Sequence, residues 1–299
     1  MLSICIPTYN YNVNPLVNEL VKQAQDTGEA YELIVVDDCS GNTVLKKENR
    51  KLRDLPGVIY LELDKNLGRA AVRNYLAAKA SYENLIFLDC DTFPVSKSFI
   101  SNYLKNINHK IIVGGIAYRD KLEDISFSLR WHYGHKRETR DAKLRSMKPY
   151  SSFMTGNFMI KKDILLRIRF DNSLTGYGHE DTLFGIVLKN EQIRIGHIDN
   201  PVYHDGLESN NVFMEKTRAG VENLLVIMQK SNIKSELVNE VALAKWFNII
   251  VSLHMLGLIA FLFNTFENIL IKQLSKKKPN LKVFDFYKLG YMCKVSLAS

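Results

Sequence analysis

The chain has 299 residues, of which 46% are hydrophobic and 24% are charged, and its formal net charge is +8. These proportions are typical of a globular protein and exclude a disordered or collagen-like chain. The length allows one large domain, or one and a half ordinary ones, with a sizeable core. The four cysteines form no CxxC pair, so we expect neither a disulfide framework nor a zinc finger. A reducing compartment is therefore the expected location. The N-terminal residues lack the basic segment and long apolar run of a signal peptide.

Short apolar runs alternate with amphipathic stretches over the first 115 residues. Continuous apolar runs of this kind are typical of strands in a mostly parallel sheet that is covered by helices on both faces. The predicted strands span residues 2–6, 33–36, 58–63, 85–88 and 111–113, and the predicted helices span 15–25, 68–80 and about 96–106. We therefore expect an α/β fold.

The second part of the chain follows a less regular pattern. Strands are predicted at 153–160 and 193–198, a short helix at 163–168, and a longer helix that ends near residue 190 after a glycine-rich turn. From about residue 211 onward the chain is predicted to be helical. A change in composition places a domain boundary near residue 225.

Polar side chains follow the predicted strands at the points where the strands end. They are Thr8 and Tyr9, Asp37 and Asp38, Asn66, and Asp89 and Asp91. In open α/β sheets, ligands bind in the crevice outside the carboxyl ends of the strands, so we expect a site there. No GxGxxG motif follows a strand and no GxxxxGK[ST] motif occurs, which argues against a dinucleotide site or a Walker-type phosphate site.

The Asp89–Cys90–Asp91 segment is the sharpest local signal in the chain. Two carboxylates one residue apart at a strand end can address one Mg²⁺ or Mn²⁺ ion, which would bridge to a phosphate. The alternative is that they cap a turn and the next helix. Asp37 and Asp38 favour the metal, because four carboxylates at one sheet edge repel one another unless a cation or hydrogen-bond donors offset their charge.

Two arginines lie on one face of the predicted helix that Gly68 opens. Arg69 and Arg73 are four residues apart, so their side chains project from the same side. Arginines near a helix N-terminus suit a diphosphate through charge and helix dipole together. The alternative is an ordinary solvated helix face, and the neighbouring aspartates weaken it.

Three glycines, Gly176, Gly178 and Gly185, flank the segment His179–Asp181 at the start of a predicted helix. Acidic residues in a first helical turn often only cap the helix, whereas the glycines indicate close approach to a ligand. His204 follows a proline-containing loop, and a single histidine of this kind is usually structural. It becomes a candidate metal ligand because the aspartate pair needs a third partner.

Five motifs of this chain, taken in order, resemble the successive motifs of family 2 glycosyltransferases. They are the segments 4–10 (ICIPTYN), 34–40 (IVVDDCS), 66–69 (NLGR), 87–91 (FLDCD) and 178–181 (GHED). The match extends over about residues 2–206 and is especially close to bacterial members that assemble surface polysaccharides. The resemblance implies a GT-A fold with a catalytic domain over 1–225, divided into a nucleotide-sugar half (about 1–115) and an acceptor half (about 116–225), and a helical region over 226–299.

The resemblance also implies a role for each matching residue. The residues implied to bind the donor are Pro7, Thr8 and Tyr9 at the base, Asp37 and Asp38 at the base and ribose, and Asn66, Arg69 and Arg73 at the ribose and diphosphate. Asp91 would bind the metal directly, Asp89 would contact ribose, sugar or metal, and His204 matches a metal-binding histidine of part of the family. Asp181 would be the catalytic base, and Glu180 would contact the acceptor or the donor sugar.

The implied activity is inverting transfer of a sugar from a nucleotide-diphosphate donor, predicted to be a UDP-sugar, to a hydroxyl of a glycan or lipid-linked glycan. Mn²⁺ or Mg²⁺ is the expected cofactor, and cell-surface polysaccharide biosynthesis is the expected process.

Other classes of protein are less favoured. A haloacid-dehalogenase phosphatase has a DxDx[TV] motif, and here Phe93 occupies the last position of that motif. A sugar-nucleotide pyrophosphorylase would need a glycine-rich loop at 7–10, and this chain has PTYN there. A non-catalytic carbohydrate-binding or nucleotide-sugar-binding protein would not need Asp89, Asp91 and Asp181.

A basic segment over residues 129–149 carries seven basic and two acidic residues, and it also contains the aromatic residues Trp131 and Tyr133. It contains no recognisable nucleic-acid-binding module, so no nucleic-acid partner is predicted. A basic loop with aromatic residues fits an anionic or lipid-diphosphate acceptor at least as well. The alternative is a solvated loop without a ligand.

An uncharged run of 21 residues, Trp246–Phe266, lies in the C-terminal region. Its length would allow it to span a bilayer, but it contains polar residues, among them Asn248, Ser252, His254 and Asn264. Residues 268–299 then carry seven lysines against one aspartate. Apolar surface beside lysines is typical of a helix that lies on an anionic cytoplasmic leaflet. We predict a cytoplasmic protein with peripheral contact to the inner face of the membrane; a helix packed on the catalytic domain and a true span are the alternatives.

Overall fold

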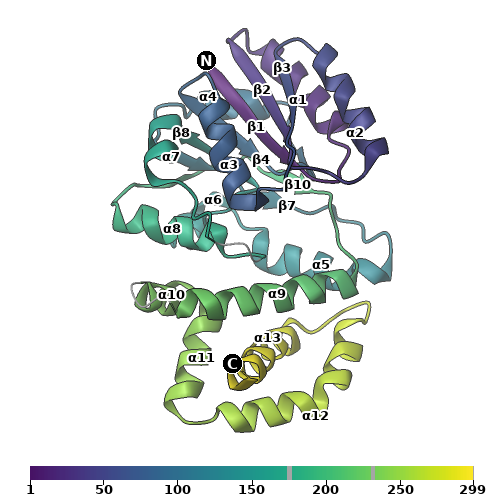
Figure 1. The fold of residues 1–299 in the computed structure, drawn as a ribbon, viewed down its shortest axis with the longest axis vertical. Helices are drawn as coiled ribbons and strands as arrows, with labels where there is room; N and C mark the ends of the chain where they lie inside the picture. The colour runs from purple at the N-terminus through teal and green to yellow at the C-terminus, as the bar shows by residue number, and fades with distance from the viewer. Residues whose placement is uncertain (174–176, 230–232, 299) are drawn as a thin grey trace. The chain divides into compact units, whose positions relative to one another are not determined.

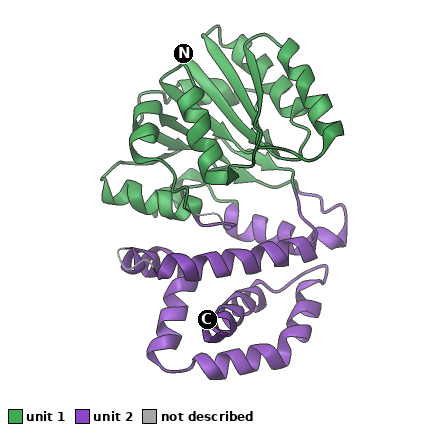
Figure 2. Ribbon diagram, viewed as in Figure 1, with its two compact units in different colours: residues 1–119, 139–175, 180–206 green, residues 120–138, 176–179, 207–299 purple. Residues whose placement is uncertain are grey.

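The computed structural model describes residues 1–173, 177–229 and 233–298 (Figure 1). The chain forms two compact units, shown in Figure 2. The sheet unit comprises residues 1–119, 139–175 and 180–206, and the helical unit comprises 120–138, 176–179 and 207–299. The boundary expected near residue 225 falls inside one continuous helix, α9 (Asn210–Met228), and the change of unit comes earlier, at Leu207.

A seven-stranded sheet forms the centre of the sheet unit (Figure 1). Its strands are β1 (Leu2–Thr8), β2 (Tyr31–Asp37), β3 (Val58–Glu62), β4 (Asn84–Leu88), β6 (Ile111–Val113), β8 (Asn157–Lys161) and β9 (Gly196–His197). Their spatial order is β3-β2-β1-β4-β8-β6-β9. The first four strands are parallel, β8 is antiparallel to both its neighbours, and β9 is parallel to β6. The expected mostly parallel sheet is confirmed.

Helices cover both faces of this sheet, as the alternating apolar runs predicted. The helices of the sheet unit are α1 (Asn14–Asp26), α2 (Thr43–Arg50), α3 (Gly68–Lys79), α4 (Phe99–Leu104), α6 (Ala142–Ser146), α7 (Lys162–Ile168) and α8 (Glu180–Asn190), with a short 3₁₀ helix at Lys51–Asp54. Residues of α3, α7 and α8 join one buried cluster with Ile34, Phe87 and Phe158 of the sheet. Ile4 and Leu33 alternate with residues of that cluster along their strands, so their side chains face the other side of the sheet, where they are also fully buried. Helix α1 contacts β2 and α4.

Several local features differ from the sequence expectation. Strand β8 begins at Asn157 and not at residue 153, and β9 covers only 196–197 of the predicted 193–198. The first strand continues through Pro7 to Thr8, because Pro7 pairs in register with Val36 of β2 and lies beyond the residues that pair with β4. Helix α2 was not expected, because Val44 and Leu45 are its only large apolar residues and it buries only Asn49. Asn42 caps it by accepting hydrogen bonds from two backbone amides of its first turn.

A second, three-stranded sheet lies in the same unit and has the order β5-β10-β7. Its strands are β5 (Thr92–Pro94), β7 (Ile116–Ala117) and β10 (Val202–His204). Strand β10 is antiparallel to β5, with His204 opposite Thr92. This pairing brings a histidine from late in the chain beside the segment that follows β4.

The helical unit consists of helices packed around a separate apolar core. They are α5 (Ser128–Tyr133), α9, α10 (Lys234–Glu240), α11 (Ala242–Ser252), α12 (Leu256–Leu274) and α13 (Leu281–Ala298), with a 3₁₀ turn at Ile125–Phe127 and a π-helical turn at Gly134–Glu138. Leu129, Met214, Phe263, Phe284 and Tyr287 form the buried centre of that core. The predicted helical C-terminal region is confirmed.

The uncharged run 246–266 is divided between two helices in the structure. Helix α11 ends at Ser252, His254 adopts a positive φ of 56°, and α12 begins at Leu256. Within the described ranges, no single helix has the length and apolar composition of a membrane span. Helices α11 and α12 reach that length and composition only as a pair, with a bend of 119° between them.

Candidate active site

The carboxyl ends of β1 and β2 meet at one edge of the main sheet, as the sequence predicted. Thr8 and Asp37 are register partners, and the amide of Asp38 donates a hydrogen bond to the carbonyl oxygen of Thr8 at 2.9 Å. Thr8 is buried, whereas the ring of Tyr9 is 53% exposed and available to a flat ligand. Pro7 precedes them inside the strand.

The carboxylate of Asp37 is fully buried and satisfied within the protein. Its oxygens accept hydrogen bonds from the amide of Ser40 at 2.6 Å and from the hydroxyl of Tyr60 at 3.1 Å. The role of Asp37 at the base and ribose therefore stays a prediction, because these bonds brace the loop after β2.

Asp38 holds the loop that leads into α3. Its carboxylate accepts hydrogen bonds from the amides of Leu67 and Gly68 at 2.7 and 2.9 Å, and Asn66 donates to its carbonyl oxygen at 2.9 Å. Burial raises the pKa of Asp38, and the two amide donors partly oppose that shift. Asn66 and Asp38 are thus brought together, and the two loops they join form one rim of the sheet edge.

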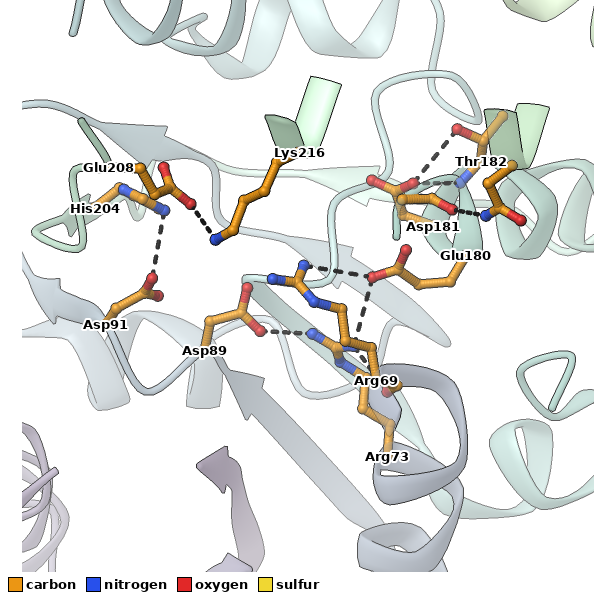
Figure 3. Close-up of polar contacts among 12 residues, drawn as sticks. Arg69, Arg73, Asp89, Asp91, Glu180, Asp181, Thr182, His204, Glu208 and Lys216 are labelled. Carbon is orange, nitrogen blue, oxygen red and sulfur yellow. Dashed lines mark hydrogen bonds and ion pairs between the residues drawn. The ribbon is translucent and has the colours of Figure 1, made fainter. Parts of the chain in front are cut away.

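Arg73 of α3 and Asp89, which follows β4, form a close ion pair (Figure 3). The Nη2 atom of Arg73 lies 2.5 Å from Oδ1 of Asp89, and the arginine side chain is only 3% exposed. Burial would raise the pKa of Asp89, but the charges of Arg73 and Arg69 outweigh it and lower that pKa. Arg73 therefore neutralises a protein carboxylate, whereas Arg69 is 52% exposed and better placed to meet a ligand anion.

Glu180 completes this cluster from the first turn of α8. Its Oε1 atom lies 3.8 Å from one guanidinium nitrogen of Arg69 and 3.8 Å from one of Arg73, and Glu180 is buried (Figure 3). The structure thus brings three predicted site residues from α3 and α8 to Asp89, although the two helices are more than 100 residues apart in sequence.

Asp91 faces His204 across the β5–β10 pairing. The Nε2 atom of His204 lies 3.6 Å from Oδ2 of Asp91 (Figure 3), and the ring of Tyr118 stacks on the histidine at 5.6 Å between centroids. A side chain at position 206 would collide with the Asp91 carboxylate, so Gly206 permits this approach. One carboxylate oxygen and one imidazole nitrogen at this separation fit two ligands of one divalent cation. Within the part of the chain that the structure describes, no cluster of three or more such ligands occurs, so a ligand would have to complete the coordination shell.

Asp181 lies beside Glu180 at the start of α8. The amide of Thr182 donates a hydrogen bond to its Oδ1 atom at 2.7 Å. Burial raises the pKa of Asp181 to about 6, and the neighbouring Glu180 carboxylate adds to the rise. A carboxylate with a pKa near neutrality is suited to general base catalysis.

The thiol between the two aspartates is not a reactive group. Burial and the charges of Asp91 and Asp89 raise the pKa of Cys90 to about 12, so it stays protonated at neutral pH. Cys90 is therefore not a candidate nucleophile.

The glycines around α8 have structural roles. A Cβ atom on Gly185 would lie 2.5 Å from the carbonyl oxygen of Tyr150, so this glycine lets α8 pack closely on that backbone. Gly178 has a positive φ of 81°, a conformation that glycine adopts readily. Gly176 lies outside the described residues.

Three residues near Asp91 were not identified from the sequence. They are Arg119, Asp205 and Tyr11. Arg119 makes two hydrogen bonds to Asp205, both at 2.7 Å. Burial, together with the charges of Asp91 and Asp205, raises the pKa of Tyr11. Asp205 directly follows His204 and Tyr11 directly follows the first motif, so adjacency was an available signal for both. No local pattern marks Arg119.

The basic segment 129–149 is partly structural. The guanidinium of Arg145 is buried and donates hydrogen bonds to the carbonyl oxygens of Gly114 and Ile198, at 3.2 and 2.6 Å. Arg130 is buried in the helical unit, where Glu138 binds it through both oxygens. These two arginines stabilise the fold, so they do not belong to the free charge that the sequence suggested.

The fold and the site together define a class of protein. A mostly parallel sheet with carboxylates at its edge, a small β5-β10-β7 sheet and an acidic pair that opens α8 correspond to the GT-A type of nucleotide-sugar-binding fold. The chain belongs to glycosyl transferase family 2, whose model matches residues 3–169.

Similar proteins agree with this assignment. Chondroitin synthase of Escherichia coli is 26% identical over 261 residues, which cover 75% of this chain and 37% of that protein. The mannosyltransferase PcManGT from Pyrobaculum calidifontis, in complex with GDP-Man and Mn²⁺, aligns with a TM-score of 0.58 at 14% identity, over 99% of this chain and 86% of that one. S. aureus TarS 1–349 in complex with UDP-GlcNAc aligns with a TM-score of 0.51 at 17% identity, over 99% and 91%. The two structures share the fold, and the chain spans well under half the length of the curated relatives it matches.

Proposed function

We propose that this protein is an inverting glycosyltransferase that moves a sugar from a UDP-sugar to a hydroxyl of a glycan or lipid-linked glycan in cell-surface polysaccharide synthesis. The observation that carries the proposal is Asp181, a partly buried carboxylate with a raised pKa in the same unit as the Asp89–Asp91 segment. Membership of the family, the chondroitin synthase relative and the UDP-GlcNAc complex of TarS support it.

The donor would bind at the sheet edge formed by the first three motifs. The exposed ring of Tyr9 offers a stacking surface for the base, beside Pro7 and Thr8. Asp38 and Asn66 shape the adjoining rim, and the half-exposed guanidinium of Arg69 would meet the diphosphate.

Asp91 and His204 would hold a divalent cation, with Mn²⁺ or Mg²⁺ as the ions proposed. The carboxylate oxygen and the imidazole nitrogen suit Mn²⁺ in particular, and diphosphate oxygens would complete the shell. When bound, the cation would offset the negative charge of the leaving nucleotide. Asp89 would serve this site indirectly, because Arg73 already occupies one of its oxygens.

Inversion requires the acceptor hydroxyl to attack the anomeric carbon from the face opposite the nucleotide. Asp181 would accept the hydroxyl proton as the new C–O bond forms, while the bond between the sugar and the phosphate breaks and its electron pair leaves with UDP. Arg69 would stabilise the departing charge, and Glu180 would position a sugar hydroxyl. No covalent intermediate is needed.

The acceptor would carry negative charge or a lipid diphosphate. Arg140, Lys143 and Lys148 remain exposed on the sheet unit after Arg145 is excluded, and cations of this kind bind phosphates. A lipid-linked acceptor would place the reaction at the inner face of the cytoplasmic membrane, with the C-terminal helices in peripheral contact with the lipid.

A donor screen tests the proposal directly. The full chain is incubated with UDP-, GDP- and dTDP-sugars and Mn²⁺, and release of the nucleotide is measured with and without EDTA. We expect release from a UDP-sugar that stops in EDTA and that falls strongly in Asp181→Asn. Absence of release from every donor, with and without candidate glycan acceptors, would contradict a transferase.

A further inference from the structure

The outer surfaces of α11 and α12 carry large apolar side chains that the protein leaves in solvent. Trp246, Leu253, Leu258, Phe261 and Ile269 are each more than half exposed. We refer to these five residues as the α11–α12 face. The inner sides of both helices contact α13, around which the two helices run in Figure 1. This leaves an apolar face that no described part of the helical unit covers.

Helix α12 turns its acidic residue inward and several large apolar side chains outward. Its only acidic residue, Glu267, points inward, where its carboxylate lies 2.8 Å from Nη2 of Arg218 and 3.3 Å from Nζ of Lys294. Leu258, Phe261 and Ile269, at spacings of three and eight residues, share the opposite side. A helix adapted to water turns charged residues outward, so this arrangement indicates an apolar environment for the outer side.

Exposed lysines follow directly on this face. Lys272, Lys276, Lys277 and Lys278 come at and after the end of α12 and are all exposed. The segment that carries them is held in place, because Ser128 and His132 contact the carbonyl oxygens of Lys276 and Lys277 at 2.9 and 3.0 Å. Across the described ranges, no ion pair with an acidic side chain occupies these four lysines. Their charge is therefore available to anionic groups.

We infer that the α11–α12 face lies in the plane of an anionic lipid surface, with its apolar side chains among the acyl chains and the lysines at the headgroups. This deepens the membrane contact of the proposed function and rests on it. The 119° bend between the helices and the packing of both on α13 favour a helix pair that lies in the surface over one that crosses it. A second copy of the chain is less favoured as the partner, because its own α11–α12 face would bring the same lysines, and like charges repel.

Vesicle flotation of the full chain tests this inference. The probes are phosphatidylcholine vesicles with and without phosphatidylglycerol. We expect the wild type to float with the anionic vesicles and to be released by high salt. Phe261→Glu should lower the bound fraction at least about tenfold, and Val44→Glu, at an equally exposed apolar position of α2, should not. The triple variant Lys276→Gln, Lys277→Gln, Lys278→Gln should lose roughly 100-fold in affinity at low salt, at about fivefold per lysine.

Two further measurements separate the alternatives. In a Trp131→Phe background Trp246 is the only tryptophan, and its fluorescence should be quenched by lipids brominated near the headgroups; stronger quenching by bromines at the acyl chain ends would overturn the in-plane arrangement. The inference of a lipid partner would be overturned if the wild type did not float. It would also be overturned if light scattering showed a dimer that Phe261→Glu abolishes. UDP release by Phe261→Glu should equal that of the wild type, so loss of membrane binding is distinguishable from loss of transferase activity.

Discussion

The guanidinium of Arg73 and the carboxylate of Asp89 are joined at 2.5 Å inside the sheet unit, and the same guanidinium lies 3.8 Å from Glu180. One buried cation thus neutralises two acids that come from different motifs of the chain. Removal of one member of a buried charge pair is costly because its partner keeps its charge without compensation. Arg73 is therefore expected to stabilise the site as well as to organise it.

Replacement of Arg73 tests this role. Arg73→Met should lower the free energy of unfolding by roughly 3–5 kcal/mol, because Asp89 loses its buried partner. Arg69→Met, at the neighbouring and half-exposed position, should change it by less than about 1 kcal/mol. Urea denaturation followed by circular dichroism measures both, and the double variant Arg73→Met/Asp89→Asn should recover part of the loss. Equal effects of the two arginine substitutions would contradict the ion pair's role.

Replacement of the proposed base should separate binding from chemistry. Asp181→Asn should leave the affinity for UDP nearly unchanged and lower turnover by roughly 10²–10⁴-fold, the usual scale of general base catalysis. Asp163→Asn, at an exposed acid in the first turn of α7, is the matched control and should retain activity. If Asp181→Asn kept turnover close to that of the wild type, Asp181 would not be the base, and Glu180 would become the candidate.

The raised pKa of Asp181 sets a pH dependence with a defined sign. A base must be ionised to accept a proton, so kcat/KM should fall about tenfold per pH unit below a pKa of about 6 and level off above it. A raised carboxyl pKa also means that ionisation destabilises the folded state as the pH rises from about 4 to about 6. Asp181→Asn should therefore increase the free energy of unfolding at about pH 7 by about 1–3 kcal/mol and leave it almost unchanged at about pH 4. A profile without an acid limb would contradict the assignment.

The contribution of the cation can be read from donor binding. Calorimetry should show that UDP binds more tightly with Mn²⁺ than in EDTA, and that Asp91→Ala removes this difference. His204→Ala, which removes a proposed ligand, should lower the affinity for Mn²⁺ by at least roughly 10–100-fold, the range that loss of a group supporting a ligand already produces at a metal site. The exposed Asp54→Ala is the control and should behave as the wild type. Affinity for UDP that EDTA does not change in the wild type would argue against a metal at Asp91.

Much of the sheet unit was predictable because its signals are local. Runs such as Leu33–Val36 are apolar on both faces, and this alone indicates strands of a covered parallel sheet. Parallel strands end at one edge, so the sequence was sufficient to predict that Thr8, Asp37 and Asp89 lie together. Elements with few apolar residues, such as α2, were missed because they contribute almost nothing to the buried core.

The sequence by itself determined the order of the strands along the chain, the residue types at their ends and the five motifs of the family. Only the tertiary structure decided which of those residues are neighbours, because contacts between distant segments depend on strand pairing and helix packing. The pairing of β10 with β5 brings His204 to Asp91, and the packing of α3 buries Arg73 but leaves Arg69 in solvent. Likewise, the uncharged composition of residues 246–266 is visible in the sequence, but the inward turn of Glu267, which leaves the outer side of α12 without an acid, follows from its partners Arg218 and Lys294 on other helices.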